Sequence, residues 1–177
     1  MGFAISWIAV KGKSKEDVLA GLGLSDTGVA DEAYESPISG AKLESGWYLL
    51  FLNEYGHRFV EAKALQQLSK GCEVLACMIE EHVMASSAEM YKDGRSIWYV
   101  AHQGDGDDIY DLTMRGALPA PFADVHRRLT GAQESEGNPP EVDYIFDIPL
   151  ELAAEICGFK HDQLNDDLPE PGFTKLV

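Results

Sequence analysis

The sequence predicts a single α+β domain spanning residues 1–177, in which a mostly antiparallel sheet carries helices on one or both faces. Three observations favour this class. Short runs rich in β-branched and aromatic residues alternate with helical patterns that end at glycine. An Asp93-Gly94 pair lies between two such runs, as in a tight β-hairpin. The chain is 45% hydrophobic and 25% charged, which is ordinary for a globular domain.

The first part of the chain alternates between strand and helix patterns. Residues 3–10 and 47–52 are predicted strands, and the second is apolar at every position, so we expect both of its faces to be covered. Helices are predicted over 14–24 and 61–69, and residues 25–46 are predicted as a loop because they contain glycine, proline and aspartate. This order leaves a mixed sheet open as an alternative to a purely antiparallel one.

The middle of the chain predicts the clearest local structure. Residues 72–84 are predicted as one long strand, and the small residues 85–88 as a bend or bulge. Residues 95–102 then form the second arm of a hairpin that turns at Asp93-Gly94. Both central positions of a type I′ turn need positive φ, which this pair tolerates.

The last third of the chain contains one more strand pattern between two helical patterns. The predictions are a helix over 122–129, a mobile linker over 134–140, a strand over 142–146, a helix over 150–157 and a loosely ordered tail over 163–177.

The charge of the chain is strongly acidic and unevenly placed. It holds 30 acidic and 14 basic side chains, a net charge of −16. The segments 25–46, 71–115 and 134–177 contribute −4, −6 and −9, and the rest of the chain is slightly positive. Such charge repels nucleic-acid phosphate and anionic lipid and attracts basic protein surfaces. The sequence therefore predicts a basic protein partner, with no nucleic acid and no membrane.

Cysteine usage and the first residues predict a cytoplasmic protein. Cys72, Cys77 and Cys157 are too few, and spaced wrongly, for a disulfide framework or a C-x-x-C motif. The apolar residues 1–10 precede the first lysines, which is the reverse of the order in a signal peptide. No apolar run approaches the ~20 residues of a membrane helix.

One group of residues suggests metal or acid–base chemistry. Glu80 and His82 share one face if 72–84 is a strand, and His102 on the neighbouring arm could complete a ligand set. No metalloprotease, calcium-loop, nucleophile-elbow or phosphate-loop motif accompanies them. We therefore expect no catalytic residue, no metal and no cofactor, and keep a small enzyme or ligand-binding protein using these three residues as the alternative.

Aromatic residues on the predicted strands, and an acidic turn, are the candidates for partner contact. About half of the aromatic side chains would be exposed if helices covered only one face of the sheet, and such side chains are enriched at binding hot spots. The partner-binding candidates are Trp47, Tyr48, Trp98, Tyr99, Tyr144, Asp105, Asp107 and Asp108.

Several stretches resemble small acidic bacterial proteins of unassigned function. They are E-H-V-M at 81–84, Y-K-D-G-R at 91–95 with I-W at 97–98, D-Y-I-F-D-I-P-L-E-L at 143–152 and G-F-K-H-D at 158–162. The composition also resembles that of the immunity proteins of toxin–immunity pairs. The resemblance implies no catalytic residue, and it fits an acidic protein-binding module, immunity-like, that inhibits a basic partner.

Overall fold

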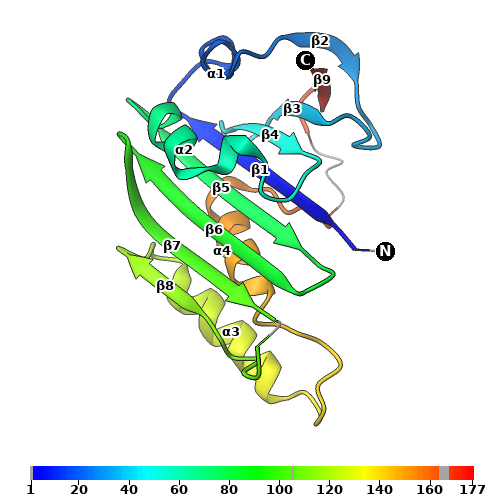
Figure 1. Cartoon of the computed structure of the whole chain (residues 1–177), viewed down its shortest axis with the longest axis vertical. Coiled ribbons are helices and arrows are strands. Elements are labelled where there is room, and N and C mark those ends of the chain that lie inside the picture. Colours follow the sequence, from blue (N-terminus) through cyan, green and yellow to red (C-terminus); the bar gives the residue numbers. More distant parts are fainter. Residues whose placement is uncertain (1, 105, 164–167) are drawn as a thin grey trace.

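The described residues, 2–104, 106–163 and 168–177 of a computed structural model, form one nine-stranded sheet with helices on both faces (Figure 1). Its strand order is β2-β9-β3-β4-β1-β5-β6-β7-β8, and each neighbouring pair is antiparallel. The α+β prediction is confirmed, and the mixed sheet is excluded among these strands.

The strands are β1 (Ala4–Lys11), β2 (Asp26–Ala30), β3 (Ile38–Lys42), β4 (Tyr48–Leu52), β5 (Glu73–Glu80), β6 (Ala85–Lys92), β7 (Arg95–Gln103), β8 (Thr113–Gly116) and β9 (Thr174–Leu176). The helices are α1 (Lys15–Leu22), α2 (Ala62–Leu68), α3 (Phe122–Glu134) and α4 (Asp147–Cys157), with a short 3-10 helix, η1 (Arg58–Val60). Within the described part of the chain, no helix combines the length and apolarity needed to cross a bilayer.

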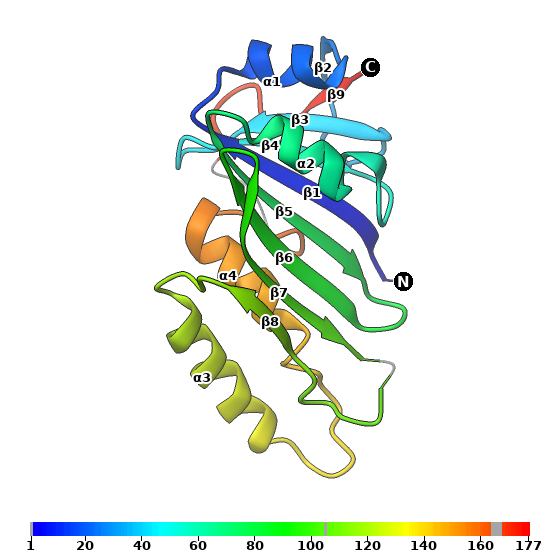
Figure 2. The same cartoon turned by 60° about the vertical axis from the view of Figure 1, so that its left-hand side comes forward.

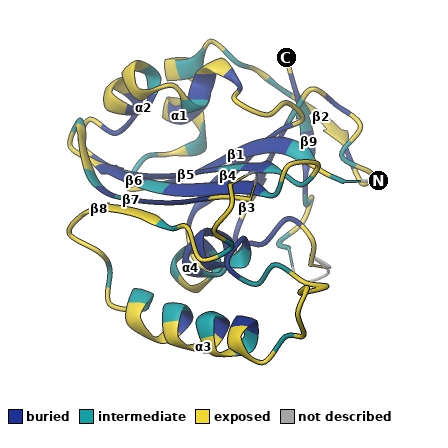
Figure 3. Cartoon of the chain, turned by 60° about the horizontal axis from the view of Figure 1, so that its bottom comes forward, coloured by how far each residue is buried: buried dark blue, intermediate teal, exposed yellow. Residues whose placement is uncertain are grey.

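Alternation along the central strands produces two hydrophobic layers, one on each face. On β1, Trp7 and Ala9 belong to the cluster beneath α4, whereas Ile8 and Val10 belong to the cluster beneath α1 and α2. Figure 3 shows the two pairs of helices on opposite sides of the sheet. The central strands are therefore buried on both faces, as the unbroken apolar run of β4 predicts.

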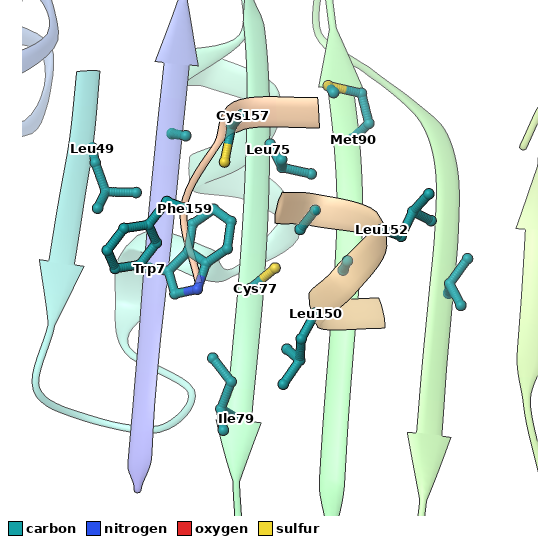
Figure 4. Packing of buried hydrophobic residues seen from close by; sticks show 14 of the residues in the cluster. Trp7, Leu49, Leu75, Cys77, Ile79, Met90, Leu150, Leu152, Cys157 and Phe159 are labelled. Carbon is teal, nitrogen blue, oxygen red and sulfur yellow. The ribbon is translucent and has the colours of Figure 1, made fainter. Parts of the chain in front are cut away.

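Helix α4 packs directly against the centre of the sheet. Leu150, Leu152 and Cys157 point from this helix toward Cys77 of β5 and its neighbours (Figure 4). The chain then turns at Gly158, whose φ of 82° is the left-handed conformation that glycine adopts at helix ends. Helix α3 contacts α4 on the side away from the sheet (Figure 3), and it buries Val125 and Leu129.

The predicted hairpin is confirmed. Strand β6 ends at Lys92 and β7 begins at Arg95, and the two turn residues have φ values of 50° for Asp93 and 78° for Gly94. These are the positive values that a type I′ turn requires.

The predicted strand over 72–84 is confirmed for Glu73–Glu80, but its extension to residue 84 is wrong. Strand β5 ends at Glu80, residues 81–84 turn, and the small residues 85–88, predicted as a bend, begin β6. Met84 adopts a φ of 50° in this turn without being glycine or asparagine. The residue types therefore gave no signal for the break.

The strand over 142–146 is also wrong. The carboxylate Oδ1 of Asp143 accepts the backbone N–H groups of Ile145 and Phe146, each at 3.1 Å, and starts the turn that leads into α4. The helix begins at Asp147, so Pro149 lies within its first turn, where a missing N–H costs no helical hydrogen bond.

Other boundaries differ from the sequence prediction. Residues 25–46 contain β2 and β3, and α3 extends five residues beyond the predicted end at 129, to Glu134. The segment 134–140 thus begins with the last residue of α3. Of the segment 163–177, residues 164–167 lie outside the described residues, and its end forms β9 between β2 and β3.

Candidate partner-binding site

A buried histidine at the end of β7 joins two acidic segments of the chain. His102 Nδ1 lies 2.6 Å from the backbone carbonyl oxygen of Asp111, and Nε2 lies 3.0 Å from Oδ2 of Asp143. The first contact reaches the loop 106–112 and the second reaches the segment 135–146. Figures 1 and 2 show that the chain between β7 and β8 and the chain between α3 and α4 lie at the same end of the molecule. We call the loop and the segment together the acidic end.

The strand itself explains why His102 points inward. It alternates in phase with Trp98 and Val100, which belong to the core on the α4 side of the sheet. Its side chain is 0% exposed. Burial lowers the pKa of His102, but the hydrogen bonds to Asp143 and to the Asp111 carbonyl outweigh it, so the pKa lies above its ordinary value.

Asp143 is committed to internal contacts. Oδ2 faces His102, Oδ1 accepts the two N–H groups before α4, and the side chain is only 13% exposed. This carboxylate therefore positions the segment 135–146 and contributes little to the exposed surface of the acidic end.

A glutamine of α3 holds the same segment from the other side. Gln133 Nε2 donates to the carbonyl oxygen of Val142 at 3.1 Å, and its Oε1 accepts the N–H of Tyr144 at 2.8 Å. The buried amide thus pairs with two backbone groups of a segment that lies outside any helix or strand. The last turn of α3, His102 and Asp143 together define the path of residues 142–146.

The carboxylates at the described surface of the acidic end form no ion pair with lysine or arginine. Asp107, Asp108, Asp111 and Glu141 are exposed, and Glu136 is half-buried. Residues 104–112 and 135–146 contain seven acids and neither lysine nor arginine. One of those seven, the predicted candidate Asp105, lies outside the described residues.

Three other acids of the carboxyl-terminal block share one lysine. Lys160, with a side chain 8% exposed, lies 3.1 Å from Asp147, 3.0 Å from Glu151 and 3.4 Å from Asp162. Burial raises the pKa of Glu151, but Lys160 and Arg128 hold it below its ordinary value. Burial keeps the pKa of Asp147 raised even beside Lys160. The sequence count of −9 for residues 134–177 therefore overstates the free charge near α4.

The structure brings together only part of the predicted Glu80, His82 and His102 set. His82 Nδ1 lies 2.6 Å from Oε1 of Glu80 at the surface, and this contact lowers the pKa of Glu80. Glu80 is in register with Ala85 and Gln103, so it shares their face of the sheet, whereas His102 lies on the opposite face. The three side chains do not converge. Among the described residues, no group of histidine, cysteine, aspartate or glutamate side chains has the arrangement of a metal site.

The predicted aromatic candidates divide between core and surface. Trp47, Tyr48 and Trp98 are buried and pack in the two hydrophobic clusters. Tyr99 is half-buried on the other face of β7, where the Arg115 guanidinium lies 4.4 Å from its ring centre. Tyr144 is half-buried within the segment 135–146 and packs on the core.

A hollow of about 380 Å³ lies away from the acidic end, between the strand β2 and the carboxyl-terminal segment. Asp31 and Tyr34 contribute to its wall. The Asp31 carboxylate already accepts the N–H groups of Glu35 and Ser36, so each of its two oxygens has a partner within the loop. Of the sequence-predicted site residues that the structure describes, none lines this hollow.

Sequence reasoning identified the acidic turn at 105–108 but missed the group that organises it. The sequence indicates that His102 is buried, because it lies on the same face of its strand as Trp98 and Val100. Nothing in the neighbouring sequence indicates that its partner is Asp143, 41 residues away. Comparison with protein-family models, curated proteins and solved structures finds no match for this chain.

Proposed function

We propose that this protein is a cytoplasmic, acidic protein-binding module, acting as an immunity-like inhibitor, whose acidic end meets a basic surface of a partner protein. The observation that carries the proposal is the pair of contacts made by His102. They hold two segments without lysine or arginine against each other and so concentrate charge that lies apart in the sequence.

The ion pairs of the described residues favour this end over other acidic surfaces. Asp26 pairs with Lys15, Glu73 with Lys92, and Asp147 and Glu151 of α4 with Lys160. No lysine or arginine in the described residues pairs with an acid of the acidic end. Unneutralised charge of one sign steers an oppositely charged partner and makes its association fast and salt-sensitive.

Apolar side chains at the same end supply contact area. Tyr110 and Val142 are each 44% exposed, one in each acidic segment. A patch of this kind combines electrostatic steering with the apolar burial that holds a complex together. It suits a basic protein surface with apolar residues among its lysines and arginines.

The same charge disfavours nucleic acid and anionic membranes as partners. Cys72, Cys77 and Cys157 are free and buried, which fits a reducing compartment and supports the cytoplasmic assignment. Either one chain or an oligomer could present the acidic end, and the proposal does not depend on which.

The test is affinity capture from the source cells with matched charge-reversal variants. The first variant combines Asp107→Lys, Asp108→Lys and Glu141→Lys. The second combines Glu32→Lys, Glu35→Lys and Glu44→Lys, which are exposed acids outside the acidic end, and it changes the net charge equally. At about 50 mM salt, wild type and the second variant should retain one basic protein, and the first variant should lose it.

Raising the salt to about 500 mM should release that protein from wild type, because screening then acts over a few ångströms. Capture that survives high salt, equal loss from both variants, or no captured protein would contradict the proposal.

A further inference from the structure

The chemistry of its two partners determines the protonation state of His102. A backbone carbonyl only accepts hydrogen bonds, and so does an ionised carboxylate. One ring nitrogen lies 2.6 Å from the carbonyl oxygen of Asp111 and the other lies 3.0 Å from the carboxylate of Asp143, and the His102 side chain is 0% exposed. Both contacts are hydrogen bonds only when both nitrogens carry a proton. A neutral ring would leave one buried acceptor facing a lone pair.

The surroundings of His102 add no competing charge among the described residues. Ser86 on β6 is directly opposite it, and its hydroxyl already donates to the carbonyl oxygen of Phe146 at 2.6 Å. From the loop and the segment, the charged groups that act on the ring are Asp111 and Asp143. The ring is therefore the cation that links two negatively charged pieces of chain.

We infer that His102 is a protonation-dependent clasp, which holds loop 106–112 against segment 135–146 while the ring is an imidazolium and releases them when it is neutral. As a regulatory device of the acidic end, the clasp rests on the proposed function. The opening and closing of the two segments is a property of the chain alone.

The direction of the pH dependence follows from linkage. The ring binds its proton more tightly when the clasp is closed than when it is open, so the clasp is strongest below the open-state pKa of about 6.5. Its contribution declines as the pH rises through the window up to the closed-state pKa, which is the higher of the two. Across that window the open fraction increases by at most about tenfold per pH unit.

Amide hydrogen exchange of the free protein between about pH 6 and about pH 9 measures this opening. Protection factors remove the intrinsic effect of pH on exchange. Amides of 106–112 and 135–143 should lose protection together as the pH rises, whereas those of β5 should keep theirs. In His102→Gln, which cannot become a cation, the two segments should be poorly protected at every pH.

Two further variants keep the test decisive. His82→Gln removes an exposed histidine at the same end and should retain the wild-type response. If His102→Gln does not fold, Asp143→Asn removes the neighbouring charge while keeping an oxygen acceptor, and it should shift the loss of protection to lower pH. Protection of the two segments that is independent of pH in wild type, or a response abolished by His82→Gln, would overturn the clasp. Because no partner is present, that result would leave the proposed function standing.

Discussion

Replacing Lys160 with methionine tests the electrostatic account of the carboxyl-terminal block. Methionine keeps most of the volume and removes the charge. In wild type the ammonium lies 3.0–3.4 Å from three carboxylates. Without it, Asp147 and Glu151 lose their common cation in a site that is largely screened from water.

The size of the effect follows from burial. Removing one partner of a buried ion pair costs about 3–5 kcal/mol, because a charge is left without compensation. The side chains of Glu151 and Asp162 are 23% and 43% exposed, so solvent offsets part of the loss. We expect Lys160→Met to lower the free energy of unfolding by about 3 kcal/mol at neutral pH.

The loss should shrink on acidification. In the variant the folded-state pKa values of Asp147 and Glu151 rise, and a raised carboxyl pKa stabilises the folded state as the pH falls. Urea unfolding followed by tryptophan fluorescence at about pH 7 and about pH 4 measures both quantities. Lys63→Met, at an exposed position of α2, is the control and should change stability by less than about 0.5 kcal/mol. A loss below about 1 kcal/mol at neutral pH, or one that is equally large in acid, would refute the reasoning.

Three further predictions concern other parts of the fold. Gly94→Ala should destabilise the protein by about 1 kcal/mol, because a φ of 78° suits glycine. Gly131→Ala in α3, where a Cβ would meet open space, should stabilise it by about 0.5–1 kcal/mol. Urea unfolding of the two variants tests both values, and effects of equal sign would contradict the backbone argument. Trp98→Ala should cost about 3–5 kcal/mol of stability, measured by chemical unfolding, since the ring is core; a loss of partner capture without a loss of stability would instead make it an interface residue. Asp143→Ala should lower the melting temperature more at about pH 6 than at about pH 9, because the contact it removes is strongest with the charged ring; an equal drop at both pH values would argue for a purely steric role.

Local chemistry made part of this fold predictable. The unbroken apolar run of β4 indicated burial on both faces, and Asp93-Gly94 indicated the turn between β6 and β7. Ser14 and Gly23, which cap α1, were equally readable: the Ser14 hydroxyl accepts the N–H of Asp17, and Gly23 has a φ of 69°. In each case the residues that determine the local structure lie within the element or directly beside it in the sequence.

The errors arose where distant contacts decide local structure. Residues 142–146 carry strand-forming side chains, yet Asp143 turns the backbone and meets a histidine from another part of the chain. Strand β9 has three residues and exists because β2 and β3 pair with it on either side. The candidate site shares this difficulty, since the sequence shows the acids but not which of them Lys160 and His102 engage.

The nitrogen-15 spectrum of the His102 side chain tests the central claim most directly. At about pH 6, both ring nitrogens should show the shifts of protonated nitrogen, and this state should persist to a higher pH than in an unperturbed histidine side chain, which titrates near 6.5. The account predicts a buried imidazolium that joins the two acidic segments. A ring with one unprotonated nitrogen at about pH 6 would contradict it, because the acidic end would then lack the cation that holds it together.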